Sequence, residues 1–549
     1  MYKKLFSVLL ILVVVSLIFS NNGILLFKES ETYEQWRLNN IIKGIVPFTP
    51  SAPLSKGFIE ESNENSQRFI SDPYLTLAPE LTIHNFDAFT KKEGWFHPCV
   101  PLFLRYRYDS LLSWFVFGVD TEVGNNFKAV INIDFKKDYR NYISNGKDHD
   151  TPPFSNVPHE LFAGNILAFD FSFPSFGYLS YSTSNLFLNV GRNKLSWGPM
   201  RNGLTISNAS DYYDNFTGLY TGTMGEGNFT YTFNIISSAS LLSDKEWEKQ
   251  DKAWDLNQQD RIYNIPSKHV IGHRFDFQPL DWFRIGIGEV NAVGGKSPDL
   301  TDFSPVIIYH NTYGEGYSNV MLSADFSVVP FKGFNIYGEF TLDDYAGSTE
   351  PSKKGKPKAY AYGGGIEYAF NFLGDGIGST AFELYHTDTW IYNRWQPLLK
   401  MTNRTVTKSE LPGARDTNEY PLGFKYGPDL NAFAIFFDAI YDNFSLKAIY
   451  EHFTQGEIDL RTPYLYMDDP DNDIDDENLY PEEDYPGLYD FTGPVGETTS
   501  ANIITIKGSY SWNSLSAGID TNFYFGDYFT QYFVKSFFFE IRPFIVYTF

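Results

Sequence analysis

The chain ends in Ser536-Phe-Phe-Phe-Glu-Ile-Arg-Pro-Phe-Ile-Val-Tyr-Thr-Phe549. Successive side chains of a β-strand point to opposite faces, so one face of this stretch is wholly apolar. That face carries Phe539, Ile541, Ile545, Tyr547 and Phe549. The pattern predicts a membrane-facing strand that stops at an aromatic residue, which a globular enzyme has no obvious need for.

The other end of the chain predicts export. Met1-Tyr-Lys-Lys precedes a run from Leu5 to Phe19 that is broken only by two serines. Two lysines followed by about fifteen mostly apolar residues are typical of a secretory signal peptide, and the run is short for a membrane helix. We expect residues 1–21 to be the signal peptide, with an uncleaved membrane helix as the alternative. Together with the terminal Phe549, the leader favours a bacterial outer-membrane barrel.

Composition is consistent with this compartment. Past the leader no stretch of 18 apolar residues occurs, which excludes a bundle of membrane helices. Aromatic residues nevertheless make up 18% of the chain at a mean hydropathy of −0.28, so apolar residues alternate with polar ones. The net charge of −24 argues against nucleic acid as a partner. The single cysteine, Cys99, cannot form an intrachain disulfide.

Alternation with a period of two recurs after about residue 100. In Phe229–Ile235, Phe229, Tyr231, Phe233 and Ile235 would face outward, and the Thr and Asn residues between them inward. Short links such as Asp442-Asn443 suit periplasmic turns, and long polar stretches suit the external side. We therefore expect an all-β transmembrane fold, an antiparallel outer-membrane barrel of about 16–18 strands over residues 96–549. A soluble sandwich would show the same alternation, but the leader and Phe549 favour the barrel.

Residues 22–95 differ from the rest. Glu29–Val46 has apolar positions at roughly helical spacing, and Gly44 is a plausible helix stop. Pro47, Pro50 and Pro53 then break the chain. We expect a small periplasmic helical element that packs under or into the barrel, the alternative being a loosely ordered linker.

Three segments carry a family resemblance. They are Leu188-Asn-Val-Gly-Arg-Asn-Lys-Leu-Ser-Trp-Gly-Pro-Met-Arg-Asn-Gly-Leu-Thr-Ile-Ser-Asn-Ala209, the stretch that starts with Ile285-Gly-Ile-Gly-Glu-Val290, and Pro421-Leu-Gly-Phe-Lys-Tyr-Gly-Pro-Asp-Leu430. In this order they resemble the Wzi family of outer-membrane capsule-assembly proteins. The acidic stretch at 468–484 departs from the family pattern.

The resemblance implies a protein of the cell outer membrane that binds surface or capsular polysaccharide and helps to attach or organise it. It implies no enzyme activity and no cofactor. Expected partners are membrane lipid, the polysaccharide and, through the Phe549 strand, the barrel-assembly machinery. The alternatives are a porin-like solute channel, which needs an open lumen, and a membrane-embedded hydrolase, for which no catalytic constellation is found.

Six residues are candidates for ligand binding. Arg192 could pair with a lumen carboxylate or an acidic sugar, and Trp197 could stack on a pyranose ring. Because Gly-Pro is first of all a turn signal, the pattern favours the alternative of a tight turn at a strand end, with Trp197 in an interface girdle. Four further aromatics in loops or at strand ends could also stack on sugars: Trp247, Trp254, Trp390 and Trp395.

Charged residues in the alternating strands point to a lumen network. With Arg192, the residues expected to form it are Arg284, Glu289, Glu339, Asp343, Asp344 and Arg394. Paired carboxylates would also suit a glycosidase, but lumen ion pairs are the default because lumen faces are polar.

Motifs for metals and phosphate fail on spacing. Asp469, Asp471, Asp473 and Asp475 alternate like calcium ligands, but the sixth position of an EF-hand must be Gly and is Ile474. Gly294-Gly-Lys-Ser297 resembles the end of a phosphate loop, but its first Gly would fall on Val290. We predict no metal site.

Overall fold

The computed structural model covers the chain and describes most of its secondary structure. The described residues are 23–59, 69–87, 101–143, 154, 169–170, 172, 174–244, 246–247, 250, 265–309, 318–344, 359–394, 396–408, 415–460, 462 and 492–549. The predicted signal peptide and the acidic stretch at 468–484 lie outside them.

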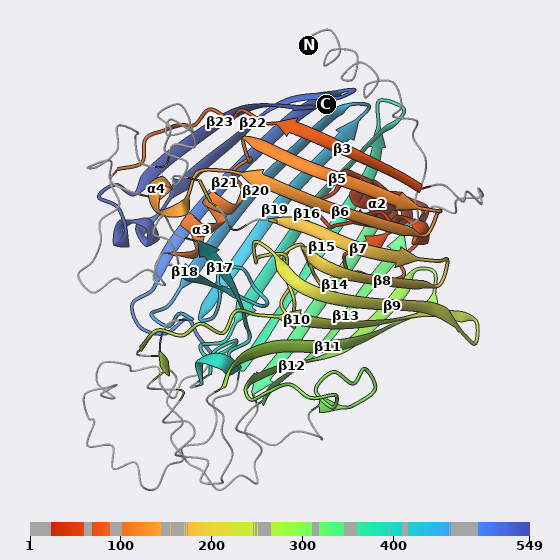
Figure 1. Ribbon diagram of the computed structural model, residues 1–549, viewed down its shortest axis with the longest axis horizontal. Helices are drawn as coiled ribbons and strands as arrows, with labels where there is room; N and C mark the ends of the chain where they lie inside the picture. Colours follow the sequence, from red (N-terminus) through yellow and green to blue (C-terminus); the bar gives the residue numbers. More distant parts are fainter. Residues whose placement is uncertain are drawn as a thin grey trace, which may run out of the picture.

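Eighteen long antiparallel strands of the described chain close into one barrel (Figure 1), as the alternating pattern predicted. They are β3 (Phe69–Leu77), β5 (Phe115–Val123), β6 (Phe127–Phe135), β7 (Phe176–Ser182), β8 (Leu186–Asn193), β9 (Tyr213–Met224), β10 (Gly227–Ser237), β11 (Ile265–Leu280), β12 (Phe283–Gly295), β13 (Ser318–Phe331), β14 (Phe334–Asp344), β15 (Ala359–Phe372), β16 (Gly376–Thr387), β19 (Leu430–Tyr441), β20 (Phe444–Gln455), β21 (Thr499–Trp512), β22 (Leu515–Phe525) and β23 (Phe537–Thr548).

The C-terminal strand closes the barrel. β23 pairs with β3 through Tyr547 opposite Leu77 and Thr548 opposite Thr76. The two-residue strand β4 (Ile83–His84) continues the seam beside Ile541. β3 lies before residue 96, where the sequence placed the start of the barrel, so that boundary was too late. The alternation in Phe69–Leu77 is masked because Asp72 and Pro73 interrupt its apolar residues.

The barrel is apolar outside and polar inside. On β10 the side chains of Thr230, Thr232 and Asn234 are buried in the lumen, as predicted. On β19 the large side chains of Ile435 and Phe437 are exposed on the outer wall. Water covers the outside of a soluble barrel, whereas an apolar outer wall suits lipid.

The two ends of the barrel differ. Tight turns such as Asp442–Asn443 and Lys332–Gly333 join strands at one end, which is the periplasmic end by the usual asymmetry of such barrels. Long connections lie at the other, external end, and carry α3 (Leu102–Asp109), α4 (Tyr139–Ile143), η4 (Pro397–Leu399), η5 (Asp527–Gln531) and the separate hairpin of β17 (Thr402–Lys408) and β18 (Arg415–Pro421). Figure 1 shows α3, α4 and this hairpin at the end opposite to helix α2.

Helix α2 (Glu31–Lys43) forms where the sequence predicted a helix. The Ser30 side chain caps its first turn by accepting from the Tyr33 backbone N–H, and Gly44 ends it in the left-handed conformation that glycine tolerates. Leu38 and Ile41 pack against Val329 and Ala369 of the barrel wall. We call residues 23–59 the N-terminal plug; they also contain β1 (Leu25–Leu26), β2 (Leu54–Ser55) and η1 (Lys56–Phe58).

The helices of the described residues are short. None of them is both long and apolar enough to cross a membrane.

The orientation of the wall can be tested on β19. Ile435→Arg places a charge in the middle of the outer face and should lower the free energy of unfolding in phospholipid vesicles by about 2–4 kcal/mol. Tyr441→Arg lies on the same face at the end of the strand and should cost about 0–1 kcal/mol, since charge near the interface is tolerated. Equal losses in denaturant titrations of the two variants would contradict a lipid-facing wall.

Candidate functional site

The lumen is entered from the external end by residues 194–212, which join β8 to β9 and which we call the inward loop. Trp197 of this loop is fully buried and its indole N–H donates to Asn234 Oδ1 at 2.9 Å. The indole ring lies against Gly272 of the barrel wall, where any side chain would collide with it. The loop is therefore part of the packed interior of the barrel.

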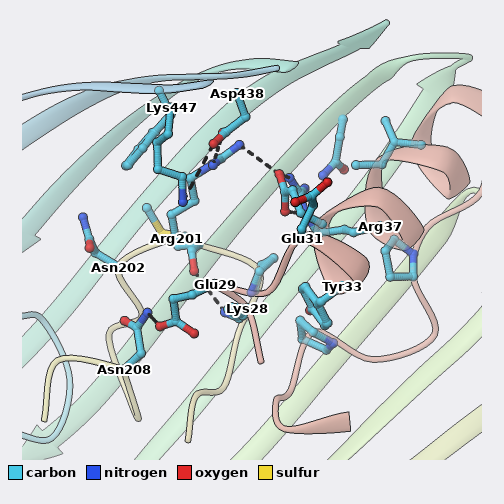
Figure 2. A pocket seen from close by; sticks show the side chains of 18 of the residues that line it. Lys28, Glu29, Glu31, Tyr33, Arg37, Arg201, Asn202, Asn208, Asp438 and Lys447 are labelled. Carbon is cyan, nitrogen blue, oxygen red and sulfur yellow. Dashed lines mark hydrogen bonds and ion pairs between the residues drawn. The ribbon is translucent and has the colours of Figure 1, made fainter. Parts of the chain in front are cut away.

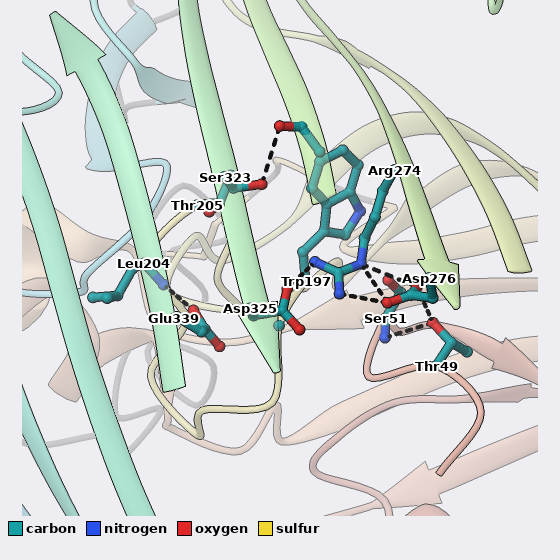
Figure 3. A network of polar contacts seen from close by, with 12 residues as sticks. Thr49, Ser51, Trp197, Leu204, Thr205, Arg274, Asp276, Ser323, Asp325 and Glu339 are labelled. Carbon is teal, nitrogen blue, oxygen red and sulfur yellow. Dashed lines mark hydrogen bonds and ion pairs between the residues drawn. The ribbon is translucent and has the colours of Figure 1, made fainter. Parts of the chain in front are cut away.

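Wall carboxylates hold the tip of the inward loop. Glu339 accepts hydrogen bonds from the Met200 N–H at 2.7 Å and the Leu204 N–H at 2.9 Å (Figure 3). Glu383 accepts from the Arg201 N–H at 3.1 Å. Backbone N–H groups satisfied in this way keep the loop inside a polar lumen.

The Arg201 side chain reaches further down the barrel. Its guanidinium lies 2.5 Å from Asp438, 2.9 Å from Glu367 and 3.5 Å from Glu34 of helix α2. Arg201 therefore connects the external loop to both the barrel wall and the N-terminal plug.

Helix α2 binds the same carboxylate from the other side. Arg37 lies 2.5 Å from Glu367 and 2.7 Å from Glu34. Burial alone would raise the pKa of Glu34, but the charges of Arg37 and Arg201 outweigh burial and hold this pKa at about 2. Glu34 thus remains ionised between two arginines at neutral pH.

Further contacts join the plug to the inward loop. The Lys28 ammonium donates to the carbonyls of Gly198 at 2.6 Å and Met200 at 3.2 Å. Burial lowers the pKa of Lys28 to about 8, although Glu339 and Glu383 oppose the shift. Asn208 donates to Glu29, and the backbones of Ala52 and Ser196 exchange two hydrogen bonds.

A second cluster of ions ties the plug to the wall. Arg274 lies 2.5 Å from both Asp276 and Asp325, and Arg284 lies 3.1 Å from Asp325. Thr49 of the plug donates to Asp276 at 2.9 Å (Figure 3). All four charged side chains are buried, and each is paired, as burial requires.

A cavity of about 490 Å³ remains between the plug, the inward loop and the wall of β19–β21. Figure 2 shows Glu31, Tyr33 and Arg37 of α2 beside it, with Arg201 between Asp438 and the helix. Lys447, Lys507 and Ser509 also line it.

The predicted lumen residues do not form a single network. Arg284 and Glu339 point inward and belong to the two clusters above. Asp343 accepts from the Tyr392 N–H at 2.8 Å, and Asp344 lies 2.6 Å from Arg394. Asp343 and Asp344 therefore hold the external segment around residues 392–394, which includes Arg394, at the mouth of the barrel.

Glu289 lies on the opposite face from the one predicted. It shares the outer face of β12 with Ile285 and Ile287, and its carboxylate accepts from the Tyr309 N–H at 2.8 Å and lies 3.1 Å from His273. Segment 303–309 covers this polar pair from outside. A polar residue on the outer wall was taken for a lumen residue because the covering segment cannot be read from alternation.

Arg192 and Trp197 also differ from the predictions made for them. Arg192 leaves the lumen: it pairs with Asp214 at 2.7 Å and lies over the Tyr212 ring, both beside the external end of β8. Trp197 has no exposed face on which a sugar could stack. Neither the girdle nor the stacking role applies to it, because Trp-Gly-Pro turns the chain into the lumen.

The four remaining candidate tryptophans lie in external connections or outside the described chain. Trp247 is half-buried beside Glu246, whose carboxylate binds Arg404, and Trp390 is buried. Trp254 and Trp395 are not among the described residues, so their roles stay predictions.

Sequence reasoning missed Arg201, Arg37, Glu367 and Asp438. Strand parity could have found Asp438, which alternates with the outward-facing Phe437 on β19. No local pattern marks Arg201, because its partners come from strands more than 150 residues away.

Residues 175–394 match the family model described as capsule assembly protein Wzi. The resemblance to the Wzi family is confirmed. Among solved structures, Wzi of Escherichia coli, described as an outer membrane protein involved in group 1 capsule assembly and a carbohydrate binding beta-barrel, aligns with a TM-score of 0.51 at 14% identity, over 95% of this chain and 98% of that one.

Other barrels align less well. OprD and OccK3 (OpdO) of Pseudomonas aeruginosa give TM-scores of 0.37 and 0.38 at 10% identity, over 87% of this chain and 95% of each of theirs. No curated protein sequence matches the chain. The Wzi-type fold and the apolar wall place the protein in the outer membrane.

The carboxylates that hold the inward loop can be removed. In Glu339→Ala/Glu383→Ala three backbone N–H groups of the loop lose their carboxylate acceptors. We therefore expect the variant to give steady conductance in planar bilayers and the wild-type protein to give none. Asp520→Ala removes a lumen carboxylate that binds Arg542 on the wall, and should stay silent. Conductance equal in wild type and double variant would contradict a loop that closes the lumen.

Docking of α2 should depend on pH. The pKa of Glu34 lies below its ordinary value, so ionised Glu34 stabilises the docked helix. This contribution to the free energy of docking, up to about 3 kcal/mol, is complete above pH 4.5 and disappears as pH falls through about 2. A fluorophore on Lys43→Cys, with Cys99→Ser, should report undocking only well below pH 4.5. Glu34→Gln should weaken docking at pH 7. Undocking at pH 4.5 or above, where an ordinary carboxylate titrates, would contradict the pairing.

Proposed function

We propose that this protein binds polysaccharide at the cell surface through its external face and takes part in capsule assembly or attachment, without catalysing a reaction. The Wzi match and the fold shared with a carbohydrate-binding barrel support the proposal. The observation that carries it is the filled lumen: the inward loop and the N-terminal plug meet inside the barrel through Lys28, Arg37 and Arg201.

The described parts of the external connections support a binding face rather than a pore mouth, because they contact one another. Asp429, in the connection from β16 to β19, accepts from the Ile458 N–H at 3.1 Å and the Val495 N–H at 3.0 Å, which joins it to both ends of the connection from β20 to β21. Trp390 and Leu399 are buried between such segments. A preorganised surface of this kind binds an extended ligand with less loss of loop freedom.

A solute channel is the alternative function. It needs a continuous aqueous path, and the inward loop and plug stand in that path, anchored to the wall at Glu339, Glu367 and Glu383. A hydrolase would need a nucleophile or a carboxylate pair free for substrate. The buried carboxylates described above are instead committed to N–H groups and arginines of the protein itself.

We propose two further partners from the barrel itself. Membrane lipid would cover the outer wall that carries Ile435 and Phe437. The barrel-assembly machinery would engage β23 with Phe549, since this strand forms the closing seam with β3.

The proposal is tested with the organism's own surface polysaccharide. Purified wild-type protein should bind it saturably and release no shorter products. Trp247→Ala, Trp254→Ala and Trp395→Ala should each weaken binding by up to about tenfold, the size of one lost stacking contact.

Trp282→Ala is the matched control. Trp282 is exposed at the turn between β11 and β12, at the periplasmic end, and should leave binding unchanged. Binding of no surface polysaccharide by the wild type, or equal loss in Trp282→Ala, would contradict an external binding face.

A further inference from the structure

The cavity inside the barrel carries features of a second ligand site. We propose that it binds an acidic saccharide on the periplasmic side of the inward loop, with Lys447 and Lys507 holding the anionic group of the sugar. This inference concerns a different face from the proposed surface binding and does not depend on it.

The first observation is the register of the wall. Lys447 of β20 and Lys507 of β21 are direct cross-strand neighbours, and both line the cavity. Like charges placed directly opposite each other are destabilising in a sheet. An anion between the two ammonium groups would remove this repulsion.

The second observation is that the neighbouring carboxylates are committed elsewhere. Asp438 is 3.8 Å from Lys447 but 2.5 Å from Arg201. Asp520, which faces Lys507 in the register, binds Arg542 at 2.8 Å. Among the described residues no carboxylate lies within ion-pair distance of Lys507, whose ammonium lies 5.8 Å from the centre of the Phe544 ring.

The other cations of the cavity differ from this pair. Lys28 donates to two carbonyls, Arg37 and Arg201 share Glu367, and Arg284 binds Asp325. These four are buried or mostly buried and hold the plug and the loop in place. Lys447 and Lys507 are the more exposed pair, so their charges are available to a ligand.

Hydroxyl and carboxylate groups nearby favour a sugar over a simple anion. Ser445 and Ser509 are cross-strand neighbours beside the lysines, joined by a hydrogen bond of 2.8 Å, and both line the cavity. Glu29 and Glu31 of the plug also line it (Figure 2). A ligand with one anionic group and several hydroxyl donors suits both kinds of lining, whereas a bare anion would meet unfavourable charge at Glu29 and Glu31.

Size and position agree with this assignment. The cavity of about 490 Å³ falls in the range of about 300–1,000 Å³ that is usual for small-ligand sites. Lys447 lies three residues into β20, which starts at the Asp442–Asn443 turn, so the site is on the periplasmic half of the barrel.

The test uses the full-length protein in detergent and three probes: galacturonate, galactose and inorganic phosphate. Calorimetric titration should show saturable binding of galacturonate and no binding of galactose. Lys447→Gln/Lys507→Gln should weaken galacturonate binding by about tenfold or more, because two charge-assisted hydrogen bonds are lost. Heat-modifiable mobility on gels confirms that the variant barrel is folded.

Lys332→Gln/Lys535→Gln makes the same change of charge at two exposed positions outside the cavity and should leave binding unchanged. Galacturonate binding that is absent in the wild type, or equal in both double variants, would overturn the site. Phosphate binding as tightly as galacturonate would overturn the assignment to a saccharide.

Discussion

Glu367 lies inside the barrel with no exposed side-chain surface, and two arginines from separate parts of the chain share it. Arg37 comes from the helix at the periplasmic end, and Arg201 from a loop that starts at the external end. A buried carboxylate is costly unless it is paired, and the same holds for each arginine. Removing Glu367 takes one buried partner from each arginine, and removing either arginine takes one from Glu367, so the wall, the plug and the inward loop stabilise one another.

This arrangement follows from the size of the barrel. Eight strands enclose an interior that side chains can fill, whereas about 16–18 strands leave a lumen of channel width. The chain fills this space with its own backbone: helix α2 of the plug lies against β13–β16, and the inward loop enters from the external end of β8. Segments that lie in a lumen need partners for their N–H groups, and the inward-facing carboxylates Glu339 and Glu383 supply them. The polar side chains of the lumen are therefore what allows the chain to fill it.

The sequence was sufficient for the wall of the barrel and for helix α2. Alternation in Phe229–Ile235 gave the correct faces because lipid and lumen impose opposite polarity on neighbouring residues. The two ends of α2, at Ser30 and Gly44, could be predicted because helix capping depends only on neighbouring residues. The first strand, β3, was missed because Asp72 and Pro73 break its pattern.

The interior could not be predicted in the same way. Trp197 was predicted to lie at the surface because nothing near it in the sequence shows that its loop enters the lumen. The indole ring fits there against Gly272, which lies 75 residues further along the chain. Glu289 looked like a lumen residue because the segment that covers it on the outer wall returns from beyond β12. Pairing of Arg201 with Glu367 and Asp438 depends on the closed register of the barrel strands, and its pairing with Glu34 depends on where the plug lies. No local sequence pattern contains either.

The most direct test of the account is whether the inward loop meets the N-terminal plug in the outer membrane. Asn208→Cys and Glu29→Cys, in a chain with Cys99→Ser, replace two side chains that hydrogen-bond across this junction. A short bifunctional maleimide added to isolated outer membranes should cross-link the two within one chain, and should not link Asn208→Cys to a cysteine at Trp282 on the periplasmic turn. Absence of the first cross-link, with both cysteines shown to react singly, would mean that the loop and the plug lie apart and that the lumen is not closed as described.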